Sequence, residues 1–194
     1  MTSTRTPTYQ VNTDGLLEVG TVTRPHGISG EIRVQVPPEY ATALLTVRRI
    51  YLHLGGGAAP RAYTVLGRRL HQDVILWRLE GIVTRNDAEA LRGAIALVRA
   101  KDLPPLGAGR HYPHELIGLR VVTVDGAVLG EVYEVLTTGA NDVYVVRQVA
   151  DAADEQNARR NRTARETLLP AIPQVVQSID LHNRVITVIL LEGL

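Results

Sequence analysis

The stretch from Gly20 to Val36, reading GTVTRPHGISGEIRVQV, constrains the fold of this chain more than any other. Apolar and polar residues alternate on both sides of its centre, and a period of two is typical of half-buried β-strands. At the centre, Pro25 fixes its own backbone φ, while Gly27 and Gly30 can adopt positive φ. We therefore expect a strand, a tight turn shaped by Pro25, Gly27 and Gly30, and a second strand.

The same alternation assigns a face to each side chain of these two strands. Leu17, Val19 and Thr21 share one face of the first strand, and Ile32, Val34 and Val36 share one face of the second. Val, Ile and Leu are abundant, Phe is absent, and Trp77 is the single tryptophan. Aliphatic β-branched side chains suit a pleated, half-buried surface, so we expect an all-β fold with an aliphatic core.

Further segments predict that the first domain is a barrel. Strands are expected at 49–54, 62–70, 74–79 and 94–98. Short helices are expected at 39–45, where Pro38 suits a helix start, and at 88–92, where residues 84–87 precede a short capped helix that Gly93 ends. Six strands can close into a barrel, and closure removes exposed strand edges. Residues 15–100 are therefore predicted to form a small β-barrel.

A Pro- and Gly-rich stretch at 101–109, reading KDLPPLGAG, breaks every periodicity and predicts a domain boundary. We expect a flexible tail at 1–14, a linker at 101–112 and a second domain at 113–194. Within that domain, residues 148–167 are too polar to bury a core, so a mobile insertion is expected there. The predicted architecture is two small β-barrels joined by a Pro/Gly-rich linker, with short helices.

The second domain reads as strands separated by turns. We expect strands at 121–124, 128–136, 143–147 and 185–190, and a turn or short helix at 175–179. The predicted turn residues are Gly118, Gly126, Gly130, Asn141 and Asp142. Asn141 and Asp142 could instead form a cation cluster with Asp125, but isolated Asp and Asn residues in hairpins are mostly turn formers.

Two separate blocks of the sequence resemble one known family. RPHGISGEIRV at 24–34 follows an apolar strand and looks like the opening signature of the ribosome maturation factor RimM family. HELIGL at 114–119, TGAND at 138–142 and LPAIP at 169–173 resemble the PRC-barrel domain that ends members of that family. The resemblance covers nearly the whole chain, and the blocks occur in the family's order.

The resemblance implies a role in ribosome assembly and no enzymatic activity. RimM proteins assist late assembly of the small-subunit head and processing of small-subunit rRNA, and their PRC-barrel half binds the head ribosomal protein S-nineteen. Their first barrel is similar to the second domain of translational GTPases. We therefore expect S-nineteen, the immature small ribosomal subunit and its rRNA as partners.

The family carries a tyrosine pair associated with subunit binding at the join between its domains. Here the join reads RHYPHE at 110–115, so His111 stands where one tyrosine is expected and Tyr112 matches the other. Glu115 replaces the usual aspartate after His114. The resemblance implies that His111, Tyr112, His114 and Glu115 bind the ribosomal protein or the subunit.

Charge is divided unevenly between the halves of the chain. The net charge is +1, but residues 1–100 carry 12 basic and 8 acidic side chains, against 9 and 12 in residues 101–194. The first half could therefore contact RNA phosphates, although a solvated surface explains a few charges equally well. The candidate RNA-facing residues are Arg24, His26, Arg33, Arg159, Arg160, Arg162 and Arg165.

Composition argues against several kinds of site. Without cysteine there is no disulfide scaffold, thiolate metal site or cysteine nucleophile, and we expect no cofactor and no metal. The Gly55–Gly57 run lacks the Gly-Lys-Ser/Thr ending of a phosphate loop, so a hairpin end is expected. No apolar run reaches the roughly 20 residues that cross a membrane, and the N-terminus has no signal-peptide core. We expect a cytoplasmic protein and, since no heptad repeat or long apolar edge is visible, a monomer.

Two other functions compete with this interpretation. His26, close to Glu31, could act as the general base of a small hydrolase or isomerase, because histidine titrates near neutrality. No nucleophile or metal-ligand set recurs at a usable spacing beside it. The second alternative is a PRC-barrel regulatory or electron-transport module, against which the barrel signature at 24–34 argues.

Overall fold

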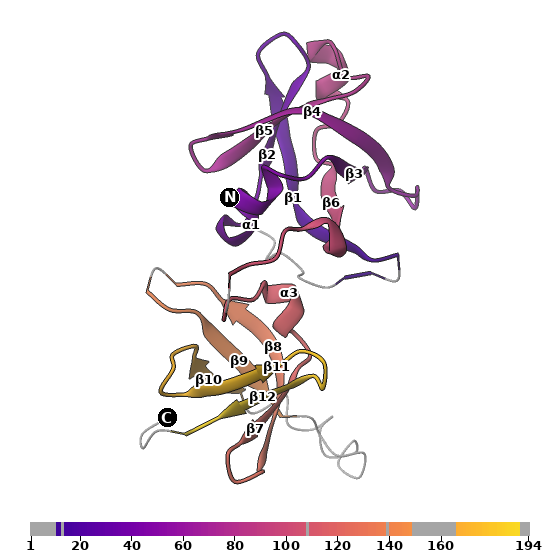
Figure 1. The fold of residues 1–194 in the computed structure, drawn as a ribbon. Helices are drawn as coiled ribbons and strands as arrows, with labels where there is room; N and C mark the ends of the chain where they lie inside the picture. The colour runs from indigo at the N-terminus through magenta and orange to yellow at the C-terminus, as the bar shows by residue number, and fades with distance from the viewer. Residues whose placement is uncertain (1–10, 13, 108, 139, 149–165, 191–194) are drawn as a thin grey trace. The chain divides into compact units, whose positions relative to one another are not determined.

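Two compact units, residues 1–110 and residues 111–194, make up the chain in this computed structural model (Figure 1). The structure describes residues 11–12, 14–107, 109–138, 140–148 and 166–190. Each unit has its own sheet and its own buried side chains.

Unit 1 is a closed barrel of six antiparallel strands. They are β1 (Leu16–His26), β2 (Glu31–Gln35), β3 (Arg49–His53), β4 (Arg61–His71), β5 (Val74–Leu79) and β6 (Ile95–Arg99). Around the barrel they follow the order β1-β2-β5-β4-β3-β6, and β6 pairs with β1 to close it. The closed six-stranded barrel expected from the sequence is confirmed.

Alternating apolar side chains fill the interior of unit 1. Trp77 on β5 is fully buried and lies opposite Ile32 of β2, which is also buried. Along β2, Ile32 and Val34 point inward while Glu31 and Arg33 are partly exposed, as the alternation predicts. Full burial of a large apolar side chain such as Ile32 stabilises the fold by about 1.5–3 kcal/mol. Burial therefore determines which face of each strand points into the barrel.

A β-bulge in β1 corrects the predicted faces of that strand. The pairing of β1 with β6 shifts register between Glu18 and Gly20. Beyond the shift Val22 is buried and Thr21 is exposed, the reverse of the expected alternation. Gly20 permits the bulge, because a Cβ there would lie 2.1 Å from the carbonyl oxygen of Gln35. One inserted residue exchanges the inward and outward positions along the rest of a strand.

Short helical segments accompany the barrel. They are α1 (Pro38–Leu44), α2 (Arg85–Glu89) and the 3₁₀ turn η1 (Ala100–Asp102). The short capped helix expected at 88–92 is present but begins earlier, at Arg85, because Oγ1 of Thr84 accepts a hydrogen bond from the N–H of Asp87 at 3.2 Å. In return the Asp87 carboxylate accepts one from the N–H of Thr84 at 2.8 Å. This capping box satisfies backbone groups that a helix end leaves without partners, and α2 packs against β1 and β2.

A turn centred on Asn12 precedes β1. Its Oδ1 accepts hydrogen bonds from the N–H groups of Asp14 and Leu16, at 3.0 and 2.9 Å. Val11 forms an isolated bridge with Leu17. These residues of the expected flexible tail are therefore fastened to the barrel, while residues 1–10 and 13 lie outside the described part of the chain.

Unit 2 is a six-stranded sheet preceded by a one-turn helix, α3 (Pro113–Leu116). Its strands are β7 (Arg120–Thr123), β8 (Val128–Leu136), β9 (Val143–Arg147), β10 (Glu166–Pro170), β11 (Val176–Asp180) and β12 (Val185–Val188). Their order is β10-β9-β8-β7-β12-β11, and only the β7–β12 pair among them is parallel. The predicted all-β class is confirmed, and its two barrel-type domains correspond to the two six-stranded sheets.

The core of unit 2 is aliphatic, as the composition indicates. Three successive residues of β9, Tyr144, Val145 and Val146, are buried, so this strand is covered on both faces. The core cluster comprises Leu116, Leu119, Val121, Val132, Val135, Tyr144, Val146, Leu169, Val175, Ile186 and Val188. Its side chains come from segments between α3 and β12, so the core joins the first and last elements of the unit.

Two segments of unit 2 differ from the sequence expectation. The predicted turn or helix at 175–179 is largely strand β11, because antiparallel pairing with β12 supplies hydrogen-bond partners that the local sequence does not reveal. Of the predicted insertion at 148–167, residues 149–165 lie outside the described residues. Glu166 already pairs with Arg147, so β10 begins inside the range expected to be mobile.

Candidate partner and nucleic-acid surfaces

The RPHGISGEIRV stretch forms the β1–β2 hairpin. Pro25 lies within β1, opposite Ile32, and so belongs to the strand rather than to the turn in which the sequence analysis put it. β6 pairs with β1 only as far as Thr21, and proline is compatible with a strand segment that is paired on one side. Gly27 and Gly30 both have positive φ and bound the turn itself, as expected.

This turn is fastened to the loop before α2. A Cβ on Gly30 would lie 2.4 Å from the carbonyl oxygen of Ile82, so only glycine fits without displacing that backbone. Nη1 of Arg85, on α2, donates a hydrogen bond to the carbonyl oxygen of Gly27 at 3.3 Å. The signature turn is therefore a shaped element held from two sides.

Two large apolar side chains are exposed on these loops. Ile28, at the tip of the turn, is 84% exposed, and Val83 is 71% exposed. Neither was identified from the sequence, because alternation patterns describe strands and these residues lie between them. An apolar residue directly after a turn glycine, as in Gly27-Ile28, was the available signal.

The candidate RNA-facing residues of unit 1 share the outer face of β1 and β2. Arg24 lies directly opposite Arg33 in the pairing of these strands, and His26 lies opposite Glu31. Like charges in opposite positions destabilise a sheet by up to about 1 kcal/mol. Glu31 does not relieve this repulsion, because its carboxylate forms an ion pair with Arg69 at 2.8 Å. Two positive residues therefore occupy opposite positions of the hairpin.

His26 has a second imidazole as its neighbour. Its ring centroid lies 5.4 Å from that of His71, with the rings tilted by 56°. Within the described residues, no group of three or more His, Cys, Asp or Glu side chains is arranged to hold a metal ion. In the described residues, His26 therefore has no metal site beside it that would support its role as a catalytic base.

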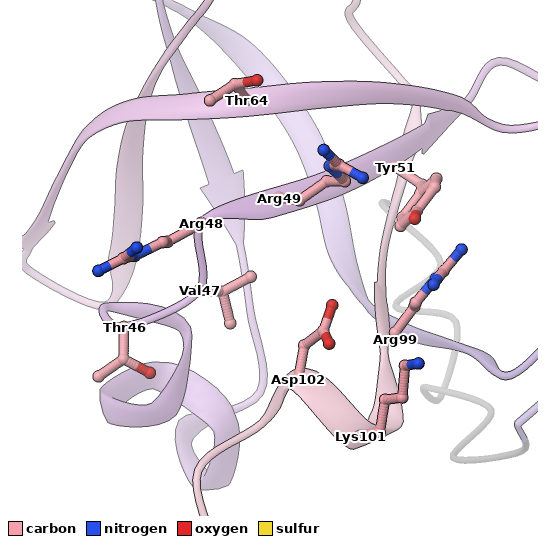
Figure 2. A pocket seen from close by; sticks show the side chains of 9 residues that line it. All are labelled: Thr46, Val47, Arg48, Arg49, Tyr51, Thr64, Arg99, Lys101 and Asp102. Carbon is pink, nitrogen blue, oxygen red and sulfur yellow. The ribbon is translucent and has the colours of Figure 1, made fainter.

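A strongly basic surface, not anticipated from the sequence, lies elsewhere on unit 1 (Figure 2). A cavity of about 540 Å³ is lined by Thr46, Val47, Arg48, Arg49, Tyr51, Thr64, Arg99, Lys101 and Asp102. A second cavity, of about 200 Å³, shares Arg49 and Thr64 and adds Arg61, Ala62, Tyr63 and Glu80. We call the two cavities together the basic groove. The adjacent arginines at 48 and 49 were its one visible sign in the sequence.

The join segment at the start of unit 2 is internally hydrogen bonded. The N–H of Tyr112 donates to Oε2 of Glu115 at 2.7 Å, and the N–H of Glu115 donates to the carbonyl oxygen of Tyr112 at 3.0 Å. The Tyr112 ring stacks on that of His114, with centroids 5.5 Å apart. Tyr112 is only 3% exposed, whereas His111, His114 and Glu115 are half-buried. The four predicted partner-binding residues therefore form one short segment in which the tyrosine side chain is buried.

The ionisation of His114 is shifted by this environment. Burial lowers the pKa of its imidazole, and the neighbouring Glu115 carboxylate raises it by a smaller amount. A buried imidazole pays a desolvation cost when it takes up a proton, so the neutral form is favoured. The ring that stacks on Tyr112 therefore favours its neutral form more than an exposed histidine does.

The predicted turn residues of unit 2 divide into two groups. Gly126 lies in the β7–β8 turn, Gly118 lies between α3 and β7, and Asn141 with Asp142 lies in the β8–β9 connection, where the Thr138 hydroxyl accepts from the N–H of Asn141. Gly130 differs, because it lies within β8. A Cβ there would be 2.2 Å from the carbonyl oxygen of Arg147, so this glycine serves close strand packing instead of a turn.

The remaining candidates, Arg159, Arg160, Arg162 and Arg165, lie outside the described residues. In the described part of the chain, no helix has the length and apolar character needed to cross a membrane.

Comparison with known proteins identifies both units. The RimM N-terminal domain model matches residues 17–103, and the RimM PRC-barrel domain model matches residues 113–194. This chain belongs to the RimM family. The two matches occur in the order expected from the signature at 24–34 and the blocks of the second half, so the resemblance seen in the sequence is confirmed.

Relatives within the RimM family align over nearly the full chain. A protein of Trichlorobacter lovleyi named ribosome maturation factor RimM is 35% identical over 183 residues, covering 94% of this chain and 97% of its own. Another with that name, from Caldanaerobacter subterraneus subsp. tengcongensis, is 37% identical and covers 91% and 96%. A crystal structure from Pseudomonas aeruginosa, described as a 16S ribosomal RNA processing protein RimM, is 32% identical with a TM-score of 0.43 and covers 89% and 96%.

Proposed function

We propose that this protein is a non-enzymatic ribosome maturation factor that assists late assembly of the small-subunit head and processing of small-subunit rRNA. The observation that carries the proposal is the match of both RimM domain models, in order, to residues 17–103 and 113–194. Relatives with the name ribosome maturation factor align over more than nine-tenths of the chain, which supports a role for the whole protein.

The mechanism that we propose is differential binding. A protein that binds the immature arrangement of rRNA and ribosomal protein more tightly than the mature one shifts the population toward folding-competent states. It dissociates once the mature surface no longer fits. Because two linked contacts raise each other's effective concentration, one unit on protein and one on RNA would give tight but reversible binding.

Unit 2 would bind ribosomal protein S-nineteen through residues 111–115. The reciprocal hydrogen bonds between Tyr112 and Glu115 support this assignment, because a preorganised segment loses little conformational entropy on binding. In this arrangement the Tyr112 ring shapes the segment from within. The half-buried edges of His111, His114 and Glu115 would make the contact.

Unit 1 would face rRNA through the outer side of β1 and β2. The opposed arginines at 24 and 33 support this, because a phosphate between them would replace repulsion by two charge-assisted hydrogen bonds. His26 would lie at the edge of that contact. The insertion arginines at 159, 160, 162 and 165 stay a prediction. We also propose that the protein acts in the cytoplasm, where subunits are assembled, and that it is a monomer.

The test is sedimentation of the purified protein with free small subunits, free large subunits and assembled ribosomes. We expect selective association with free small subunits. Tyr112→Ala, which removes the ring that supports the join, should weaken association roughly tenfold, and His111→Ala should weaken it less. Tyr112→Phe keeps the ring and removes the hydroxyl, so it measures the contribution of the hydroxyl alone. Val124→Ala, a substitution at a 55% exposed residue of the same unit, is the matched control.

Circular dichroism of each variant distinguishes lost binding from lost folding. Failure of the wild-type protein to associate with any ribosomal particle, over a range of salt concentrations, would exclude the proposed function. If Val124→Ala weakened association as much as Tyr112→Ala, the contact would not lie at residues 111–115.

A further inference from the structure

Barrel closure assembles the basic groove from distant parts of the sequence. β3 pairs with β6, with Tyr51 opposite Leu97, so the start of β3 lies near the end of β6. Arg49 comes from β3, Arg99 from the end of β6 and Lys101 from η1. Figure 2 shows Arg99, Lys101 and Asp102 on one side of the strand that carries Arg49, while the Arg48 side chain extends away from them.

The charge of the groove is strongly positive. Five cations line it, Arg48, Arg49, Arg61, Arg99 and Lys101, against the two carboxylates of Asp102 and Glu80. All five cations are solvent-exposed, and within the part of the chain that the structure describes none of them forms an ion pair. The positive charges are therefore available to a ligand without first breaking an ion pair.

Two tyrosine rings orient the arginines of the groove. The guanidinium carbon of Arg99 lies 5.8 Å from the centroid of the Tyr51 ring, and that of Arg61 lies 5.3 Å from the Tyr63 ring. Such cation–π contacts hold the planar guanidinium groups while leaving their N–H edges free to bind. Because a guanidinium fork matches two phosphate oxygens, these arginines are preorganised for phosphate.

We propose that the basic groove binds the phosphodiester backbone of single-stranded rRNA. Its cations are exposed and spread over two cavities that share Arg49, which suits a chain of phosphates better than one enclosed anion. Half-buried Tyr51 adds an aromatic surface beside them, as in sites that combine backbone contacts with base stacking. The choice of RNA over an acidic protein rests on the proposed function in rRNA maturation.

The test measures RNA binding by the full-length protein. Fluorescence anisotropy of a labelled single-stranded RNA of about twelve nucleotides, comparable to known single-strand site sizes, is followed over a series of salt concentrations. The groove variant carries Arg49→Gln and Arg99→Gln. The matched control carries Arg78→Gln and Arg92→Gln, which also removes two exposed positive charges of unit 1, at residues that line neither cavity.

We expect the groove variant to bind RNA roughly tenfold more weakly at low salt, since two charge-assisted contacts are lost. The slope of log affinity against log salt should fall in magnitude by about 1.4, at about 0.7 for each phosphate contact on a single strand. The control should retain the wild-type slope. Wild-type affinity and slope in the groove variant would overturn the proposal, as would displacement of the RNA by poly-glutamate of equal charge at equal concentration.

Sedimentation of the same proteins with small subunits separates this proposal from the function on which it rests. If the wild type sediments with small subunits while the groove variant keeps full RNA affinity, the groove assignment alone fails. If the groove variant loses RNA affinity but the wild type sediments with no ribosomal particle, the groove binds RNA and the proposed function fails.

Discussion

Single residues determine this fold most firmly where one backbone approaches another. A Cβ on Gly20, Gly30 or Gly130 would lie between 2.1 and 2.4 Å from a carbonyl oxygen of another segment. Two of these glycines lie within β1 and β8, and one lies in the signature turn. At such positions glycine is required by the lack of space for a Cβ as well as by the backbone dihedral φ. The two requirements can be tested separately by comparing glycines with similar φ but different surroundings.

Gly30→Ala should destabilise unit 1 considerably more than Gly27→Ala. Both glycines have similar positive φ, 76° and 68°, and a positive φ costs alanine about 1–2 kcal/mol. Only at position 30 would the new Cβ also meet a backbone oxygen, whereas position 27 is open. We expect a total loss of about 3 kcal/mol or more for Gly30→Ala. Urea unfolding followed by Trp77 fluorescence measures the difference, and equal losses would show that the Ile82 contact is unimportant.

At the scale of elements, α2 is too short to be stable alone and depends on its cap and its packing. Helices of one or two turns are marginal in water, because each end leaves backbone groups without partners. The Thr84–Asp87 box satisfies these groups, and Arg85 connects the helix to the signature turn. Cap strength should therefore influence the order of the turn that carries Ile28.

Thr84→Ala should lower the free energy of unfolding of unit 1 by about 1 kcal/mol, the usual cost of removing an N-cap hydroxyl. Thr42→Ala, an exposed substitution inside α1, is the control and should change stability little or increase it slightly. Hydrogen exchange at the amides of residues 27–30 should accelerate in the Thr84 variant alone. Unchanged exchange there would show that the turn does not depend on α2.

The cap also predicts a dependence on pH at the acid end. Hydrogen bonds from Thr84, the largest cause, and from Val83 lower the pKa of the Asp87 carboxyl. A carboxyl with a lowered pKa in the folded state contributes stability above its unfolded value of about 3.9, and this is lost as pH falls through the folded pKa. Asp87→Asn should therefore flatten the fall in unit 1 stability below about pH 4, as acid titrations of urea unfolding can check. An unchanged acid slope would assign that fall to other carboxyls.

At the scale of the whole molecule, two separate cores stabilise two units of one chain. The single tryptophan, Trp77, is buried in unit 1, so its fluorescence reports on that unit, whereas far-ultraviolet circular dichroism reports on both. Units with separate cores can unfold in separate transitions. The proposed simultaneous binding of protein and RNA uses the same division.

Leu169→Ala should destabilise unit 2 by about 2–5 kcal/mol, because this fully buried side chain of β10 belongs to the unit 2 core. The transition seen by circular dichroism should broaden or divide, while the Trp77 transition stays at its wild-type midpoint. Leu168→Ala, at a 54% exposed position of the same strand, is the control. A matching shift of the Trp77 transition would show that the two units unfold together.

Strand periodicity, turn glycines and the α2 cap could be interpreted from the sequence because their causes are local. Alternation in residues 31–36 predicted the faces of β2, and residues 84–93 predicted a short capped helix. Where a long-range partner decides, local patterns were insufficient. β11 is a strand because β12 pairs with it, and the faces of β1 exchange at Gly20 because a bulge accommodates β6.

By itself, the sequence determined the all-β class, most strand positions and, through its two signature blocks, the RimM family, because each depends on residues that are neighbours in the chain. Only the tertiary structure decided which side chains meet. Closure of β3 against β6 brings Arg49 and Arg99 to one groove, and the join folds so that the Tyr112 side chain is buried. The physical reason is that surfaces depend on strand order and register, which arise from burial of a shared core and not from the spacing of residues along the chain.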